Sequence, residues 1–414
     1  MFLELLRRRN PALLSDAIRL HQAGQLPPNV YVLDLDAVER NAVTLGSEAY
    51  ALGLRPFAMT KQIGRNPDVV AAIQRGGITE AVGVDLECAA ADAAAGLTIG
   101  HIGHLVQIPR VQAAVAAELK PRYWTVFSEQ KAREAGEAAS RAGYVQDVLL
   151  RIVGDGDSFY TSHEGGFPSE DVVAVANALD KIGGIRVAGV TTFPATLFDR
   201  DAGTVRSTPN LATLTDAKKR LLDSGRREVE LNAPGTTSTA MLHTLADAGA
   251  TQVEPGHGLT GTTPWHAVED LAEEPAIAYV TEVSHLWNDH AYVFGGGLYV
   301  DPVLSGAPPT RAIIVPAGGG LEDSITLPVE MPAPEAIDYY ATIPLSGTQV
   351  CPGDTVLFGF RPQVFVSRGL TAGIANVGSQ SPRVTGLWAS NGARPLQVGQ
   401  HDYALPSTTS TGDL

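Results

Sequence analysis

The chain has 414 residues, of which 44% are hydrophobic, and its formal net charge is −15. This acidic balance disfavours nucleic acids and anionic membranes as partners, and Cys88 and Cys351 alone cannot form a disulfide framework or a cysteine-rich zinc site. The N-terminal segment places apolar residues before its arginines, the wrong order for a secretory signal, and no apolar run reaches about 18 residues. We therefore expect a cytoplasmic globular enzyme with room for a barrel of roughly 250 residues and a second domain.

The first 53 residues are expected to form a helical arm, a strand over residues 30–34 and a helix that Asp36 caps. Eight strand–helix units follow. Their predicted strands cover residues 54–60, 80–85, 99–104, 123–128, 145–153, 186–193, 228–233 and 251–256. Apolar strands joined by connections of helical length indicate a parallel sheet, and eight such units predict an α/β fold with a (β/α)8 TIM-type barrel over residues 54–275.

The sequence period changes after about residue 275. The segments that follow are rich in Val, Phe and Tyr and are separated by Gly and Pro; they are AIAYVTEVSHLW, HAYVFGG, RAIIVPA, DTVLFGF and PQVFVS. They predict an antiparallel β-domain over residues 276–400, which the strand at 30–34 is expected to join. The tail, residues 401–414, is expected to be frayed.

Lys61 stands at the C-terminal end of the first predicted barrel strand. Catalytic groups of such barrels lie at these strand ends, where a desolvated amine can attack a carbonyl. For a lone lysine, a solvated or salt-bridged side chain is the ordinary alternative. The other strand ends favour the catalytic interpretation.

Two Gly-rich loops follow the last two predicted strands: residues 232–239 (NAPGTTST) and 254–258 (EPGHG). Each alone is more often an ordinary helix cap, but glycines, hydroxyls and N–H groups at a helix start also bind anions. On adjacent strands of the barrel that carries Lys61, the two loops together predict a phosphorylated aldehyde cofactor, most simply pyridoxal 5'-phosphate. The residues expected to bind it are Lys61, Gly235, Thr236, Thr237, Glu254, Gly256 and His257.

Glu254 is the last side chain before the Pro-Gly of the second loop. A carboxylate below the cofactor would keep its pyridine nitrogen protonated and strengthen the ring as an electron sink. A glutamate that caps a helix or forms a salt bridge is the alternative.

The chain resembles the alanine racemase-like superfamily of fold-type III pyridoxal-phosphate enzymes over essentially its whole length. YVLDLDAVERNA is similar to the strand and helix before the barrel, FAMTK to the Schiff-base segment, NAPGTTSTA to the phosphate loop and EPGHGLTG to the loop after strand 8. TKQIGRNP, HIGHLVQIP and FGFRPQVFVSRG resemble the YhfX-like branch. The resemblance implies a homodimer in which each β-domain closes the partner's barrel, with shared active sites.

Two departures from the family pattern bear on the reaction. In alanine racemases the position matching Glu254 is an arginine, whereas a glutamate there is similar to ornithine-type racemases and the decarboxylase branch. Residues 353–365 lack the His-containing metal motif of the D-serine dehydratase and D-threonine aldolase branch. We therefore predict no metal, and we disfavour alanine as the substrate and those two reactions.

Other polar residues each allow two interpretations. His163 either approaches the cofactor ring or is a surface histidine, and Asp85 is as well explained as a helix cap. His104 and Gln107 could line the pocket.

In the β-domain, the turn CPGD holds Cys351 and Asp354; these two residues and His285 are candidates for an acid/base from the partner subunit. The residues expected to be catalytic are Lys61, His163 and Cys351.

The leading hypothesis is an amino-acid racemase, an isomerase that removes and returns the Cα proton while the substrate is bound to pyridoxal phosphate as a Schiff base. Lys61 is one acid/base and a residue on the opposite face is the other. A decarboxylase or aldolase on the same fold is the alternative, because the substrate bond perpendicular to the ring decides the reaction. A non-catalytic pyridoxal-phosphate carrier is disfavoured by the large β-domain. A cofactor-free Schiff-base aldolase would leave both loops unexplained.

Overall fold

The computed structural model describes residues 2–294, 310–332, 339–398 and 401–402. The chain divides into two compact units, each described by itself. The barrel unit comprises residues 39–61 and 70–273, and the β-unit comprises residues 1–38, 62–69 and 274–414. The predicted tail beyond residue 402 lies outside the described residues. Among the described helices, none is both long and apolar enough to cross a membrane.

Eight parallel strands form the barrel. Their order is β2 (Arg55–Pro56), β12 (Gln252–Val253), β11 (Glu230–Asn232), β8 (Ile185–Thr191), β6 (Gln146–Val153), β5 (Tyr123–Val126), β4 (Thr98–Ile102) and β3 (Glu80–Gly83). A parallel bridge between Ala58 and Ala81 joins the chain after β2 to β3, so the ring is nearly closed. The predicted eight-strand α/β barrel is confirmed.

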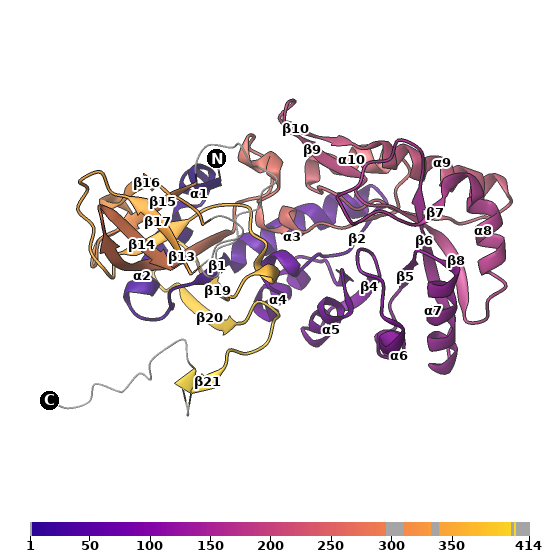
Figure 1. Ribbon diagram of the computed structural model, residues 1–414, viewed down its shortest axis with the longest axis horizontal. Helices are drawn as coiled ribbons and strands as arrows, with labels where there is room; N and C mark the ends of the chain where they lie inside the picture. The colour runs from indigo at the N-terminus through magenta and orange to yellow at the C-terminus, as the bar shows by residue number, and fades with distance from the viewer. Residues whose placement is uncertain (1, 295–309, 333–338, 399–400, 403–414) are drawn as a thin grey trace. The chain divides into compact units, whose positions relative to one another are not determined.

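Helices cover the outside of these strands (Figure 1). Those after the first barrel strand are α4 (Pro67–Arg75), α5 (Leu86–Ala94), α6 (Ala113–Glu118), α7 (Glu129–Arg141), α8 (Val172–Leu179), α9 (Pro209–Asp223) and α10 (Thr239–Asp247). Helix α7 shows why they pack: it buries small side chains such as Ala132 and Ala135 and exposes charged residues such as Arg133 and Glu137.

Two helix starts test the predicted caps. The Asp85 side chain accepts a hydrogen bond from the Cys88 amide at 2.7 Å and caps α5, so the cap interpretation of Asp85 is confirmed. The cap predicted at Asp36 is wrong. Helix α3 (Leu35–Ala51) begins earlier, because Asp34 Oδ1 accepts from the amides of Asp36 and Ala37 at 3.1 and 3.0 Å.

The barrel unit also holds strands that the sequence did not reveal. Strands β9 (Thr196–Asp199) and β10 (Thr204–Ser207) form an antiparallel hairpin, and β7 (Phe167–Pro168) pairs with β6. These strands have only two to four residues, too few to show an alternating pattern.

The β-unit contains a mostly antiparallel sheet. Its order is β16 (Ile325–Pro328), β15 (Arg311–Val315), β18 (Thr355–Phe358), β13 (Ile277–Trp287), β1 (Val30–Asp34), β19 (Leu370–Ala375) and β20 (Arg383–Trp388), and β14 (His290–Phe294) joins β13 to β17 (Tyr340–Pro344). Strand β1 lies centrally, antiparallel to β13 and parallel to β19. The strand predicted over PQVFVS is wrong, because Val364–Val366 is a 3-10 turn.

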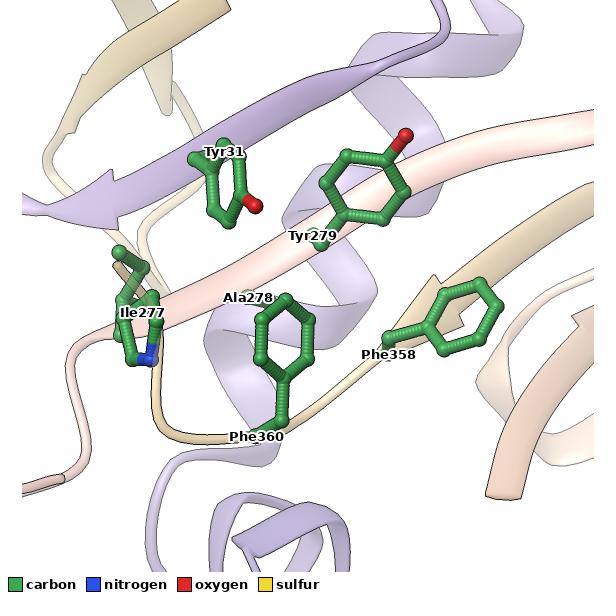
Figure 2. A pocket seen from close by; sticks show the side chains of 7 residues that line it. Tyr31, Ile277, Ala278, Tyr279, Phe358 and Phe360 are labelled. Carbon is green, nitrogen blue, oxygen red and sulfur yellow. The ribbon is translucent and has the colours of Figure 1, made fainter. Parts of the chain in front are cut away.

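Alternate residues of the central strands face two different surroundings. On one face, Val30, Val32 and Val280 pack in a core with the N-terminal helices α1 (Phe2–Arg9) and α2 (Pro11–Gln22). On the other face, Tyr31 and Tyr279 meet edge to face with ring centroids 5.1 Å apart. Figure 2 shows these rings with Phe358 and Phe360 around a small pocket in the β-unit.

The segment directly after Lys61 belongs to the β-unit. The Asn66 side-chain amide donates to the Thr371 hydroxyl at 2.9 Å, and Asp68 accepts hydrogen bonds from Thr385 and Trp388 at 2.7 and 2.9 Å. These bonds hold residues 66 and 68 within the β-unit, five and seven residues after Lys61, where the first segment of the barrel unit ends.

Candidate active site

Five polar side chains from different strands form one hydrogen-bonded network inside the barrel. Glu254 Oε1 lies 2.6 Å from His101 Nδ1 and accepts from Asn232 Nδ2 at 3.0 Å. His101 Nε2 lies 2.6 Å from the Thr125 hydroxyl, and the Thr191 hydroxyl donates to Asn232 Oδ1 at 2.7 Å. All five are buried. Strands β4, β5, β8 and β11, and the end of β12, thus meet at one carboxylate.

Glu254 is an anion at neutral pH. Burial by itself raises its pKa, but His104, His101 and Asn232 together bring the pKa down to about 2. The second oxygen, Oε2, lies 3.3 Å from His104 Nε2 and has no hydrogen-bond partner among the described residues. The carboxylate therefore keeps an acceptor for a further group.

His104 is neutral and close to both cations of the site. Burial lowers its pKa to about 3 although the charge of Glu254 opposes this, and the positive charges of Arg151 and Lys61 lower it further. Its ring packs edge-on against Phe193 at 5.5 Å. Lys61 itself is half-buried. The structure therefore brings Lys61, His104 and Glu254 into one electrostatic cluster.

Arg151 was not predicted from the sequence, although it is fully buried on β6. Its Nη2 donates to the carbonyl oxygens of His163 and Phe193 at 3.1 and 3.0 Å, while Nε and Nη1 have no hydrogen-bond partner among the described residues. Burial lowers its pKa to about 10, so it remains charged at neutral pH. A buried guanidinium with unused donors is suited to an anionic group.

His163 lies at the exposed edge of this cluster. Its ring is 6.4 Å from that of Phe193 and 6.1 Å from that of Tyr160, and the ring itself is open to solvent. This position is compatible both with a side chain that approaches the cofactor and with an ordinary surface histidine. Its catalytic role stays a prediction.

Gly235 was expected to let the loop after β11 approach a phosphate, but the structure shows a close approach to another part of the chain. A Cβ at Gly235 would lie 2.4 Å from Thr196 Oγ1 and 2.6 Å from its carbonyl oxygen. The Thr236 amide donates to the Thr196 carbonyl, and the Thr196 hydroxyl donates to the Thr236 carbonyl, each at 3.1 Å. Gly235 thus lets the loop dock on β9, and its contact with a phosphate stays a prediction.

The start of α10 is partly occupied by a carboxylate that the sequence did not reveal. Glu273 Oε1 accepts from the amide and the hydroxyl of Thr239 at 2.6 and 2.7 Å, and Oε2 lies 3.2 Å from His266 Nε2. The Ser238 hydroxyl at the helix N-cap is buried and has no hydrogen-bond partner among the described residues. Ser238 and buried Thr237 therefore remain for another polar group.

The loop after β12 packs on the loop after β11, as adjacent strands require. A Cβ at Gly258 would lie 2.6 Å from the Thr237 carbonyl oxygen. His257 is buried at the start of the 3-10 turn His257–Thr260, directly after Gly256, and its Nδ1 lies 3.1 Å from the Thr262 hydroxyl. The two predicted loops are thus neighbours.

Two further candidates, Gln107 and Asp354, have structural roles. The Gln107 amide donates to the carbonyls of Gly103 and Thr125, which ties the loop after β4 to β5. In the β-unit, Asp354 Oδ2 accepts from the Cys351 amide at 2.7 Å, so the turn interpretation of CPGD is confirmed. The Cys351 thiol is exposed, and His285, also exposed, stacks on a tyrosine. Whether either supplies an acid/base stays a prediction.

The barrel cluster suits pyridoxal phosphate in its chemistry. Lys61 offers an amine. Within the part of the chain that the structure describes, Glu254 Oε2 is an anionic acceptor without a hydrogen-bond partner, and two Arg151 nitrogens and the Ser238 hydroxyl also lack one. These groups match an aldehyde, a protonated ring nitrogen and anionic substituents.

A metal is less well matched. Ligand atoms of His101, His104 and Glu254 lie within 4.8 Å of one another, but both ring nitrogens of His101 already have partners at 2.6 Å. The absence of a metal stays a prediction.

The residues missed from the sequence share one signal. Each is a buried polar side chain in the C-terminal half of a barrel strand. They are His101, Thr125, Arg151, Thr191 and Asn232.

A near-closed parallel barrel with a lysine after its first strand, followed by a mostly antiparallel β-sheet, is the architecture of the fold-type III pyridoxal-phosphate enzymes. The family model "Alanine racemase, N-terminal domain" matches residues 33–264, and the model "YhfX-like, C-terminal domain" matches residues 278–384. The chain belongs to the alanine racemase N-terminal domain family and carries a YhfX-like C-terminal domain. The resemblance found in the sequence is confirmed.

Relatives agree with this assignment. The chain is 36% identical over 392 residues to "Uncharacterized protein YhfX" of Escherichia coli (strain K12), covering 95% of this chain and 99% of that protein. Its fold is similar to D-threonine aldolase from Filomicrobium marinum (TM-score 0.64, 18% identity, 88% and 97% of the two chains covered). It is also similar to alanine racemase of Clostridium difficile 630 (TM-score 0.61, 14% identity, 88% and 98% covered). The fold family typically uses pyridoxal phosphate.

Proposed function

We propose that the protein is a pyridoxal-phosphate-dependent amino-acid racemase. The observation that carries the proposal is the convergence of Lys61, neutral His104 and anionic Glu254, whose Oε2 has no hydrogen-bond partner among the described side chains. When bound, pyridoxal phosphate delocalises the electron pair that remains at Cα after a substrate bond breaks. A buried anionic acceptor is what a protonated ring nitrogen of this kind requires.

The side chains divide the work by their chemistry. Lys61 would hold the aldehyde carbon of the cofactor and would carry the Cα proton of the substrate. Glu254 Oε2 would accept a hydrogen bond from the protonated pyridine nitrogen. Arg151 Nε and Nη1 would bind an anionic group of the cofactor or the substrate, and the Ser238 hydroxyl would bind the phosphate.

Racemisation requires a second acid/base on the face of Cα opposite Lys61. His104 is a poor candidate for donating a proton, because burial lowers its pKa to about 3. His163 and Cys351 are exposed and remain the proposed candidates, the latter from a partner subunit. A decarboxylase removes no Cα proton, whereas an aldolase needs a base for the β-hydroxyl proton of its substrate.

The test is incubation of the cofactor-loaded protein with a panel of amino acids in D2O. Racemisation accompanied by deuterium incorporation at Cα supports the proposal. Release of CO2 would assign a decarboxylase, and release of an aldehyde would assign an aldolase. Lys61→Ala is the control and should abolish each of these reactions. A protein that exchanges no Cα proton and forms no product with any amino acid would contradict the proposal.

The cofactor itself is tested by colour. Protein loaded with pyridoxal phosphate should absorb in the visible range, and borohydride should fix the chromophore covalently on Lys61, detectable by peptide mass. A protein that gains no visible band with added cofactor would refute the assignment.

A further inference from the structure

The two oxygens of Glu254 have unequal surroundings. Oε1 takes part in two hydrogen bonds, with His101 Nδ1 at 2.6 Å and with Asn232 Nδ2 at 3.0 Å. Oε2 lies 3.3 Å from Nε2 of the neutral His104 and has no hydrogen-bond partner among the described residues. An ionised carboxylate offers about four acceptor positions, two on each oxygen. Those of Oε1 are therefore occupied, whereas those of Oε2 remain available for another donor.

The position of hydrogen on His101 follows from its partner. An ionised Glu254 can only accept, so Nδ1 of His101 carries hydrogen and donates it. The contact of Nε2 with the Thr125 hydroxyl at 2.6 Å then fixes the plane of the ring from the other side. Both histidine nitrogens are used, and the ring is fully buried and immobilised between strands β5 and β12.

We propose that His101 is a positioning residue that holds Glu254 through Oε1, so that Oε2 is presented to the pyridine nitrogen of the cofactor. This inference rests on the proposed function. It assigns His101, which touches neither substrate nor cofactor, the task of orienting the carboxylate. Asn232 shares this task at the same oxygen, to which its neutral side-chain amide donates.

The purpose of a histidine here follows from the cost of burying a charge. A buried carboxylate without donors would rather take up a proton, and a protonated Glu254 could no longer accept from a ring N–H. A short bond from His101 opposes that uptake and also prevents rotation of the carboxylate. Removing His101 should therefore weaken one specific contact to the cofactor rather than the whole site.

The experiment measures the dissociation constants of two cofactors from three proteins. The cofactors are pyridoxal phosphate and its 1-deaza analogue, in which carbon replaces the ring nitrogen. The proteins are the wild type, His101→Phe, which keeps a ring and loses the donor, and His101→Asn, whose amide lies about where Nδ1 lies. Wild-type protein should prefer pyridoxal phosphate over the analogue by about tenfold or more, as expected for a charge-assisted hydrogen bond.

In His101→Phe this preference should shrink toward unity, because affinity for pyridoxal phosphate falls while affinity for the analogue is retained. His101→Asn should restore most of the preference. The band of bound pyridoxal phosphate should also titrate at lower pH in His101→Phe, since the ring nitrogen loses its anionic acceptor.

Equal loss of affinity for both cofactors in His101→Phe would show a merely structural role and overturn the inference, as would an unchanged preference. Failure of the wild type to bind pyridoxal phosphate at all would overturn the proposed function and this inference with it. The two failures are therefore distinguishable.

Discussion

Single residues of the site depend on charges held away from water. Glu254 stays ionised only because histidines and an amide surround it, and Arg151 stays charged although its side chain is fully buried. Such groups are costly to bury unless a ligand or neighbours compensate them. Each can therefore be tested by a substitution that changes charge and preserves shape.

Glu254→Gln should retain the cofactor but slow Cα–H exchange by about tenfold or more, since loss of a charge-assisted hydrogen bond costs about 1.5–3 kcal/mol. The measurement is the rate of deuterium incorporation at saturating cofactor. Glu269→Gln, at an exposed helix-end residue that binds Trp265, is the matched control and should leave the rate unchanged. Equal rates in Glu254→Gln and the wild type would make Glu254 structural.

His104 should make the apo-protein sensitive to mild acid. Burial lowers its pKa from 6.5 to about 3, so the unfolded chain binds a proton there between these values and the folded chain does not. Its contribution to stability is present above pH 6.5 and is lost as the pH falls toward 3, by about 1.4 kcal/mol per pH unit.

Urea unfolding at several pH values should therefore give a shallower loss of stability for His104→Asn than for the wild type between pH 6.5 and 4. His243→Asn, at an exposed histidine of α10, is the control and should keep the wild-type slope. A His104→Asn slope equal to that of the wild type would mean that His104 becomes charged without cost.

At this scale the sequence identifies residues at strand ends and misses those inside strands. Lys61 and Glu254 could be predicted because each directly precedes a loop at the barrel mouth. Arg151 and His101 lie within apolar runs, where a single polar residue does not show its partner. Their roles depend on contacts between strands far apart in the chain, such as His101 with Glu254.

At the scale of elements, strands and helices were predictable where an apolar pattern was long enough. All eight barrel strands follow from alternation with helices, but their ends shift because ladder hydrogen bonds stop before the apolar run does. The hairpin of β9 and β10 and the carboxylate at the start of α10 were not predictable. Glu273 lies 34 residues from Thr239, and nothing local indicates their pairing.

Glu273→Gln should destabilise the apo-protein by about 1–3 kcal/mol, because it removes a buried charge that pairs with His266 and with the N-terminus of α10. The free energy of unfolding in urea is the measurement. Glu129→Gln, an exposed acid in the first turn of α7, serves as the control and should change stability little. Similar stabilities for the two variants would contradict the capping role.

At the scale of the whole molecule, the class of fold and the family could be inferred from the sequence, whereas the reaction and the assembly could not. We expect a homodimer with shared sites, since racemisation requires a second acid/base and Cys351 of a partner subunit is a candidate for it. Shared sites can be tested by complementation.

Lys61→Ala and Cys351→Ser chains should each be inactive as homodimers if Cys351 is the second acid/base. Mixing them after mild dissociation should restore part of the activity, because some mixed dimers then contain one intact site. Activity of the Cys351→Ser homodimer would remove Cys351 from the reaction, and full activity of a monomer shown by ultracentrifugation would refute shared sites.

The central position of β1 has a consequence for synthesis of the chain. Val30 pairs with Val280 on one side and with Leu370 on the other, so this strand leaves the ribosome long before either neighbour exists. The barrel strands, which lie between β1 and these partners in the sequence, can assemble first, while both edges of β1 remain unpaired. A nascent chain stalled before residue 277 should therefore bind a holdase chaperone through β1. The chaperone should dissociate only after both partner strands, β13 and β19, have been translated.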